Sequence, residues 1–290
     1  MTRPCPGPVP PRAPRNRLPP GACDSHIHVF GPYDRFPLNA DRSYTPPEAP
    51  LESYLAMMKV MGLERVVVVH GSAHGLMLDA TIDAVQRLGP RGRGIAVASP
   101  DISDGELDRL HAAGFRGLRV VSVVRGGVAA GEAPRLARRI ERLGWHLQFL
   151  INGPEEMESL APALLELPVP FVIDSFGRFR PEHGVDHPGF RTLLNLLETD
   201  RCWVKFTGLE RRTHTGPPYA DVAPLGRALI AARPDRIVWG SDWPHVMAFD
   251  HPVPRDGDLL DWLLDMDVSD AIKTDILVAN PERLYGFDPL

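Results

Sequence analysis

The chain is predicted to be an α/β protein, a slightly distorted (β/α)8 TIM barrel, from three features of its sequence. Eight short segments rich in Val, Ile and Leu are strand candidates, and amphipathic segments separate them. Such strands are typical of parallel sheets, and eight repeats in about 250 residues suit a closed barrel. Polar residues gather at the carboxyl ends of the strands, where barrels carry their chemistry. An open doubly wound sheet is the alternative, but no G-x-G-x-x-G motif follows the first strand.

Strand and helix candidates alternate along the chain. We expect strands at 22–28, 65–70, 93–99, 117–123, 145–151, 170–175, 202–207 and 236–242. We expect helices at 50–62, 75–89, 103–114, 132–144, 154–167, 188–199 and 220–233. In the segment SDGELDRLHAAG, for example, Ser103 can cap a helix that Gly114 would end. The order strand, helix, strand is the one that a parallel barrel requires.

Length, composition and charge exclude several classes of protein. With 290 residues, 43% of them hydrophobic, the chain can bury a substantial core. A net charge of -5 and a pI near 6.1 provide no basic surface for nucleic acid. No apolar run approaches the roughly 20 residues that a membrane span needs. The three cysteines show no C-x-x-C spacing, which argues against disulfides and zinc knuckles and favours a cytoplasmic location.

Two regions are expected along the chain. Residues 1–20 are rich in Pro and Arg, and we expect them to form a disordered tail. They contain no apolar stretch, so they do not have the pattern of a secretory signal. We expect residues 21–290 to form a single (β/α)8 domain, and the sequence leaves open whether the protein forms a homo-oligomer.

The first and last strands carry the most informative polar residues. In CDSHIHVFG, strand alternation places Asp24, His26 and His28 on one face. Three polar side chains on a buried strand are costly unless they have a role. The last strand ends in GSDWPH, whose Asp242 would lie at the same mouth of the barrel. There Asp242 could act as a general base on water, while the two histidines polarise a carbonyl.

The motifs DSHIH and GSDWPH together resemble the amidohydrolase superfamily, in its amidohydrolase-related (amidohydrolase 2) branch. The resemblance covers residues 21 to about 286 and includes NPERLYGF near the end of the chain. Within this branch, HVFGPYDRFPLNADRSYTPPEAP is similar to the 2-pyrone-4,6-dicarboxylate lactonases and related sugar-acid lactonases. The resemblance implies a metal-independent hydrolase that opens a small carboxylated lactone.

A group of arginines predicts a small anionic substrate. Arg119 and Arg125 have the same parity after the fourth strand, and Arg211 follows the seventh, although its neighbour Arg212 could make the contact instead. Guanidinium groups bind carboxylates bidentately and stay charged. The resemblance implies that these arginines hold the substrate's carboxylates, with Tyr44 and Ser72 at the edge. The remaining expected substrate-binding residues are His70, Gln148 and Ser175.

The donor set argues against a firmly held metal ion. The relatives typically have a histidine where Ser175 stands, and His146 lies too early in the fifth strand to replace it. This leaves His26, His28 and Asp242 as donors, so we expect no cofactor. Zinc bound by these three residues and a water is the alternative.

Ser175 also keeps other functions open. Without a histidine at this position, the chain could be a decarboxylase, isomerase or hydratase of a small carboxylic acid, with zinc as a potential cofactor. A catalytically inactive barrel that only binds its ligand is the second alternative.

Overall fold

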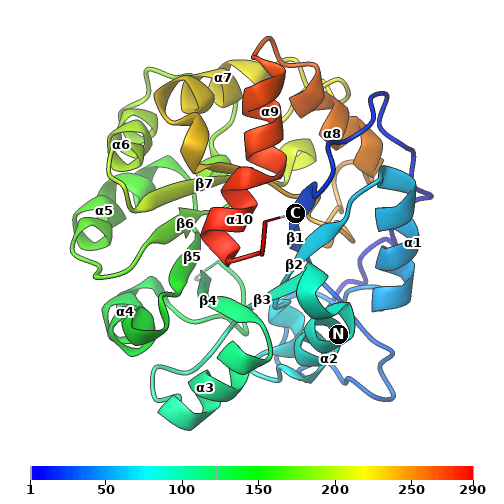
Figure 1. Ribbon diagram of the computed structural model, residues 1–290, viewed down its shortest axis with the longest axis vertical. Helices are drawn as coiled ribbons and strands as arrows, with labels where there is room; N and C mark the ends of the chain where they lie inside the picture. The colour runs from blue at the N-terminus through cyan, green and yellow to red at the C-terminus, as the bar shows by residue number, and fades with distance from the viewer. Residues whose placement is uncertain (1, 122, 290) are drawn as a thin grey trace.

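Eight parallel strands form one sheet in the order β1 to β8, with helices outside it (Figure 1). The computed structural model describes residues 2–121 and 123–289. The strands are β1 Cys23–Ile27, β2 Arg65–Val69, β3 Gly92–Ala96, β4 Phe115–Val121, β5 His146–Leu150, β6 Phe171–Ile173, β7 Cys202–Phe206 and β8 Ile237–Trp239. The (β/α)8 TIM barrel predicted from the sequence is confirmed.

The helices that follow the strands lie near the expected positions. They are α1 Leu51–Met61, α2 Asp79–Leu88, α3 Asp104–Ala112, α4 Ala133–Ile140, α5 Pro154–Leu165, α6 Pro188–Leu197, α7 Ala223–Ala232, α8 Asp256–Leu264, α9 Asp270–Leu277 and α10 Ala279–Tyr285. Ser103 caps α3 as expected, because its side chain accepts a hydrogen bond from the Glu106 backbone N–H at 3.2 Å. Within the described ranges, no helix has both the length and the apolar character that crossing a bilayer requires.

The barrel closes between β1 and the residues just after β8. The Asp242 N–H donates to the carbonyl of His26 at 2.9 Å, and the His28 N–H donates to the carbonyl of Trp243 at 2.8 Å. The seam therefore continues past the end of β8, at the carboxyl ends of the strands. The predicted histidine pair and the predicted aspartate thus share one stretch of backbone pairing.

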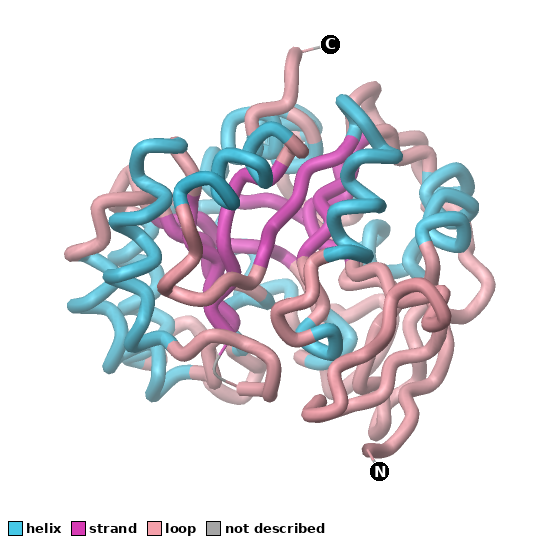
Figure 2. The backbone as a smooth tube through the Cα atoms, turned by 90° about the horizontal axis from the view of Figure 1, so that it is seen from below, coloured by secondary structure: helices cyan, strands magenta, loops and turns pink. Residues whose placement is uncertain are grey.

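The core has two layers. Large apolar side chains fill the space between the sheet and the surrounding helices, as in most barrels. Inside the barrel, a smaller cluster includes Cys23, Val67, Ile95 and Tyr285. Helix α10 lies across this end of the barrel in Figure 1, and the two chain ends lie on opposite sides of the molecule in Figure 2.

A β-bulge in β1 corrects one expectation about the first strand. Asp24 pairs with Val66 and Ile27 with Val68, so β1 has one residue more than β2 between these two points. The extra residue reverses the alternation, and the Asp24 carboxylate accepts hydrogen bonds from Tyr54 of α1 and from the Ser241 side chain. Asp24 therefore does not share the face of the two histidines, because strict alternation fails at a bulge.

The N-terminal segment differs from the disordered tail that its composition predicts. The Cys5 N–H donates to the carbonyl of Thr45 at 2.8 Å, and the Cys5 and Leu18 side chains are buried. Arg12 lies 2.6 Å from Asp258 and also pairs with Asp261, both on α8. The composition of a proline-rich segment indicates that it forms few hydrogen bonds within itself. It does not indicate that the segment contacts an acidic helix elsewhere in the chain.

Residues 31–50 form an ordered loop at the mouth of the barrel. The loop begins and ends at the backbone pair between Phe30 and Ala49, which exchange both hydrogen bonds. Its far part reaches the loop after β4, where the Arg125 N–H donates to the Ser43 hydroxyl at 2.8 Å. Loops after β1, β2 and β4 are therefore joined around one side of the mouth.

We expect Gly240→Ala to destabilise the fold, because Gly240 lies at the closing seam. A Cβ at this position would be 2.6 Å from the His26 Cβ and 2.7 Å from the His26 nitrogen. Such overpacking costs about 1–3 kcal/mol, so urea unfolding should show a free energy of unfolding lower by roughly 2 kcal/mol.

Gly105→Ala is the matched control, because a Cβ there meets nothing within 4 Å. In helix α3 this change should be neutral or stabilising by about 0.5–1 kcal/mol. If the two alanine variants lost equal stability, the close approach at the seam would not be the reason.

Candidate active site

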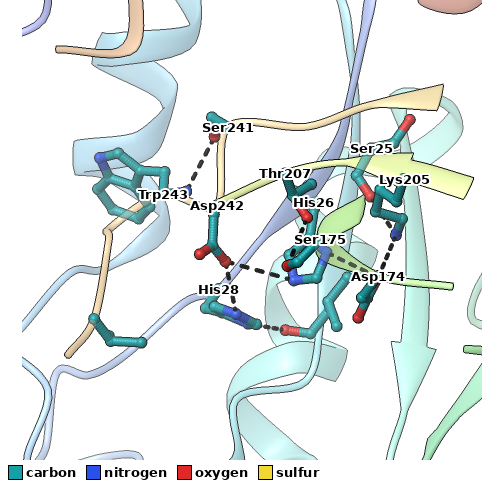
Figure 3. A network of polar contacts seen from close by, with 12 residues as sticks. Ser25, His26, His28, Asp174, Ser175, Lys205, Thr207, Ser241, Asp242 and Trp243 are labelled. Atoms are coloured by element: carbon teal, nitrogen blue, oxygen red, sulfur yellow. Dashed lines mark hydrogen bonds and ion pairs between the residues drawn. The ribbon is translucent and has the colours of Figure 1, made fainter. Parts of the chain in front are cut away.

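The predicted catalytic residues form one cluster where β1 meets the segment after β8 (Figure 3). Asp242 Oδ1 lies 3.5 Å from Nε2 of His28 and 3.7 Å from Nε2 of His26. Both imidazoles are buried, whereas 13% of the Asp242 side chain is exposed. Asp242 also has a φ of +67°, a left-handed conformation that non-glycine residues rarely adopt and that often marks a functional site.

The hydrogen bond on the far side of His28 determines how this ring faces Asp242. His28 Nδ1 lies 2.8 Å from the carbonyl oxygen of Val69. A carbonyl can only accept, so Nδ1 carries a hydrogen and Nε2 is the nitrogen that faces the carboxylate. In a neutral imidazole this Nε2 has a lone pair, which would repel the Asp242 oxygen. A proton on Nε2, or a cation between the two groups, removes the repulsion.

A second carboxylate, Asp174 at the end of β6, lies on the opposite side of His26 (Figure 3). Asp174 Oδ1 is 3.6 Å from Nδ1 of His26 and 3.9 Å from Nζ of Lys205. Its Oδ2 accepts a hydrogen bond from the Gln148 side-chain amide at 2.9 Å. Asp174, Gln148 and Lys205 are completely buried. They form a charged layer directly beneath the histidine pair.

The charges of this layer shift the pKa values of its members. Burial alone would raise the pKa of Asp174, but His26, Lys205 and Arg119 hold it well below its ordinary value. Burial lowers the pKa of Lys205 to about 8 and that of His26 to about 3. His26 is therefore neutral at physiological pH, while the carboxylate beneath it is ionised.

Asp242 is ionised for a related reason. Burial would raise its pKa, but the hydrogen bond from His28 and the positive charge of Arg211 hold that pKa far below the ordinary value. Arg211 Nη2 lies 3.4 Å from Asp242 Oδ2, so one carboxylate oxygen faces the histidines and the other faces the guanidinium.

The predicted arginines occupy different depths. Arg119 is buried, and its Nη2 lies 3.5 Å from Asp174 while its Nε has no hydrogen-bond partner among the described residues. Arg211 stands beside Asp242, as described above. Arg125 is largely exposed and pairs with Asp41 at 2.8 Å, on the loop that covers the mouth. Arg211 therefore contacts the cluster directly, Arg119 lies in the charged layer beneath it, and Arg125 lies at its rim.

Two predicted substrate-binding residues have their polar atoms engaged within the protein. His70 Nε2 lies 2.9 Å from the Gly75 carbonyl, and its Nδ1 lies 2.8 Å from the Thr81 hydroxyl. The Gln148 amide donates to Asp174, and its oxygen accepts from Lys205 at 2.8 Å. Neither side chain has a free polar group to offer a substrate in this arrangement.

The remaining predicted residues lie around the mouth. The hydroxyl groups of Tyr44 and Ser72 are 3.3 Å apart, and both residues are buried. Ser175 is half-buried, and its hydroxyl lies 3.2 Å from that of Thr207 at the end of β7. A hydroxyl group therefore occupies the position where we expected the relatives to have an imidazole.

The sequence patterns assign no catalytic or binding role to Asp174 or Lys205. Asp174 follows a buried strand and Lys205 is a charged residue within one, so both were candidates for the barrel mouth. A buried lysine needs an acidic partner, but the identity of that acid depends on the barrel geometry. The arginine at position 178 was also not singled out.

The cluster of His26, His28 and Asp242 also fits a metal ion. Their ligand atoms all lie within 4.8 Å of one another, and neither ring nitrogen of His26 has a hydrogen-bond partner among the described residues. Two imidazoles and a carboxylate form the donor set of a catalytic zinc with an open position. Arg211 already supplies positive charge to Asp242, so the same residues also suit a metal-free site.

A (β/α)8 barrel with a histidine pair on its first strand and an aspartate after its last is the arrangement of a barrel hydrolase. The chain belongs to the amidohydrolase family, whose sequence profile matches residues 23–287. The family membership expected from DSHIH and GSDWPH is confirmed.

Two of the similar proteins are lactone hydrolases. A 4-sulfomuconolactone hydrolase of Hydrogenophaga intermedia is 40% identical over 275 residues, which cover 93% of this chain and 90% of that protein. A 2-pyrone-4,6-dicarboxylate hydrolase of Comamonas testosteroni is 37% identical over 286 residues, covering 95% and 93% of the two chains. A crystal structure from Agrobacterium tumefaciens has a TM-score of 0.87 at 28% identity, with 96% and 100% coverage. The protein is therefore an enzyme of the hydrolase class that acts on a small molecule.

We expect acid to destabilise the folded protein, because three of its buried histidines must stay neutral. Burial lowers the pKa of His26, His70 and His146 to about 3 from the ordinary 6.5. Their contribution to stability is complete above pH 6.5 and is lost as the pH falls toward 3, because the unfolded chain then binds more protons. Each of these histidines should lower the free energy of unfolding by about 2 kcal/mol near pH 5.

Asp24 has the opposite effect on stability. Burial raises its pKa to about 6, so below this pH the folded protein binds a proton that the unfolded chain does not yet bind, and the folded state is favoured. The contribution of Asp24 near pH 5 is about 1 kcal/mol, so the free energies of unfolding in urea near pH 7.5 and near pH 5 should differ by roughly 5 kcal/mol. His146→Leu should reduce this difference, because it removes one titrating group. A free energy of unfolding that did not change with pH would contradict the neutral histidines.

Proposed function

We propose that the protein hydrolyses a small lactone that carries anionic groups, with Asp242 as the general base and no metal ion. The observation that carries this proposal is the position of Asp242, a carboxylate at the barrel mouth with imidazoles on one side and a guanidinium on the other. A carboxylate of this kind can take a proton from water, and the guanidinium and imidazole groups around it can stabilise a developing oxyanion.

In the first step, water attacks the carbonyl carbon of the lactone. A bond forms between the water oxygen and this carbon, and Asp242 takes the proton that the water releases. The carbonyl π electrons move to the oxygen, which becomes an oxyanion. The imidazoles of His26 and His28 lie beside Asp242, and a ring nitrogen that carries a proton on this side is placed to donate a hydrogen bond to that oxygen.

In the second step, the tetrahedral intermediate opens the ring. The bond between the carbonyl carbon and the ring oxygen breaks, and the departing oxygen receives the proton that Asp242 had taken. The products are one carboxylic acid and one hydroxyl or enol group on the same open chain. Asp242 returns to its ionised state, so water is the single co-reactant consumed.

Arg211 connects substrate binding to the strength of the base. While Arg211 pairs with Asp242 at 3.4 Å, it helps hold the pKa of that carboxyl far below its ordinary value, which makes the carboxylate a poor base. A substrate carboxylate that engages Arg211 would take over part of this positive charge. The pKa of Asp242 would then rise in the complex, and the base would become stronger when substrate is bound.

The anionic character of the substrate follows from the arginines and from the relatives. Arg119 and Arg211 face the site, and Arg125 lies at its rim. The names of the two curated relatives describe lactones with a sulfonate or with two carboxylates. The three cysteines are free and buried, which supports a reducing compartment such as the cytoplasm.

Zinc remains the competing cofactor proposal. His26, His28 and Asp242 would hold it, and when bound it would lower the pKa of a coordinated water and polarise a carbonyl. In that case Asp242 would be a ligand and could not serve as the free base.

We expect Asp242→Asn to abolish lactone opening, with kcat lowered by roughly 10³-fold or more, because the amide cannot take the proton from water. A spectrophotometric ring-opening assay on carboxylated and sulfonated lactones measures this effect.

The same assay after dialysis against a chelator, together with elemental analysis, tests the cofactor. Activity should survive, and no stoichiometric zinc should be found. Activity that disappears with the chelator and returns with zinc would show that the metal-free mechanism is wrong. A clean blank of the untreated enzyme on every lactone would overturn hydrolysis itself.

We expect Asp174→Asn to lower kcat by roughly 10–100-fold with little change in KM. The amide no longer provides the negative charge that faces His26 Nδ1 at 3.6 Å, so the ring loses its orientation. Arg191→Gln on the exposed surface of α6 is the control and should leave both constants unchanged. A rise in KM of similar size with kcat unchanged would place Asp174 in substrate binding instead.

A further inference from the structure

Four arginines gather on one side of the barrel mouth, in the loops after β6 and β7. Arg178 and Arg180 follow β6, and Arg211 and Arg212 follow β7. The two loops are joined by a hydrogen bond in which Arg212 Nη1 donates to the carbonyl of Arg178 at 3.2 Å. They meet again where His214 lies 2.7 Å from Glu182. This pair of loops forms a basic wall opposite the loop at 31–50.

The basic wall is short of negative charge. Arg211 pairs with Glu210 and Asp242, but Arg178, Arg180 and Arg212 form no ion pair with any described carboxylate. Arg212 is buried, and its Nε has no hydrogen-bond partner among the described residues. Burial and the neighbouring arginines lower the pKa of Arg212 to about 9. Glu210 acts on Arg212 and Glu156 acts on Arg178 at a distance, but neither forms an ion pair with them, so the wall keeps an excess of positive charge.

Arg178 is the member of the wall that reaches the loop after β5, the strand next to β6. Its Nη1 donates to the side-chain oxygen of Asn152, which follows β5, at 3.2 Å. Burial and the charges of Arg211 and Arg180 lower the pKa of this guanidinium, and Glu156 opposes them. The half-buried guanidinium of Arg178 therefore lies along the rim between the ends of β6 and β5, close enough to Arg211 for the two charges to interact.

The backbone that presents Arg178 is strained. Ser175, Phe176, Gly177 and Arg178 have φ values of +53°, +57°, +64° and +59°. A run of left-handed residues of which three are not glycine is unfavourable, and such strain is concentrated at functional sites. The turn is the direct continuation of β6 after Asp174, so the same short segment supports His26 from below and carries Arg178 into the mouth.

We propose that Arg178 forms a second anion subsite, which binds the anionic group of the substrate that lies farthest from the lactone bond. Arg211 and Asn152 flank this subsite, and Arg212 supports it by holding the Arg178 carbonyl. The proposal deepens the proposed function, because it makes the preferred substrate a lactone with two separated anionic groups. The distal group is a carboxylate or a sulfonate, since both offer oxygens to a planar guanidinium.

The test uses unreactive dianions, so that it does not depend on hydrolysis. Isothermal titration measures binding of benzene-1,3-dicarboxylate, 3-sulfobenzoate and benzoate to the full-length protein. Arg178→Asn should weaken binding of the two dianions by at least about tenfold and that of benzoate by less than about twofold. The dianion with the larger loss identifies the distal group as carboxylate or sulfonate.

Two further variants separate a binding role from a structural one. Asn adopts left-handed backbone more readily than Arg, so Arg178→Asn should have a Tm equal to or above that of the unmodified protein. Arg178→Lys keeps the charge and should retain part of the preference for dianions. Arg191→Gln removes an equal charge from the outer surface of α6 and should leave all three affinities unchanged.

Equal losses for all three probes, no loss for any probe, or no dianion binding by the unmodified protein would overturn the subsite. Loss of dianion binding in both Arg178 variants together with a lower Tm would also overturn it. A lactone assay run in parallel distinguishes the two proposals. If the dianions bind through Arg178 but no lactone is opened, the subsite stands and hydrolysis is rejected. If lactones are opened equally well by the Arg178→Asn variant, hydrolysis stands and the subsite is rejected.

Discussion

The carboxylate of Asp24 is the contact on which the rest of the site depends. It accepts hydrogen bonds from the Ser241 N–H at 2.9 Å, the Ser241 hydroxyl at 2.6 Å and the His26 N–H at 3.1 Å. The first and last segments of the barrel are thereby held together through one buried group. The bulge in β1 makes this possible, because it turns Asp24 toward Ser241 while His26 faces the mouth. The geometry of the candidate site and the closure of the barrel therefore depend on the same atoms.

The electrostatic design of the site places one neutral imidazole between two ionised carboxylates. Asp174 lies below His26 and Asp242 lies above it, and each carboxylate has its own cations. Beneath the ring the charges are internally matched by Lys205 and Arg119. At the mouth the balance is positive. An excess of positive charge would be costly in a closed core. At an opening an anionic ligand can neutralise it, so the excess favours binding of such a ligand.

Sequence patterns predicted the barrel, its element order and the proximity of His26, His28 and Asp242, because these follow from periodicity and from motifs at the two ends of the chain. They do not report features that depend on a local irregularity or on a contact between distant segments. One extra residue in β1 reversed the orientation of Asp24, and Gln148, expected to touch substrate, is engaged by Asp174 and Lys205. The left-handed turn that carries Arg178 has no sequence signature, since only one of its four residues is a glycine.

The position of α10 has a consequence for how the protein is made. Tyr285 and Phe287, near the end of the chain, fill the interior of the barrel together with residues from its first three strands. Arg65 and Arg93, at the beginnings of β2 and β3, bind backbone carbonyls of Asp288 and Gly286. During synthesis, the early strands can form long before these partners leave the ribosome. The interior of the nascent barrel is therefore incomplete until residues 285–288 have been synthesised, which happens only after all eight strands have been made.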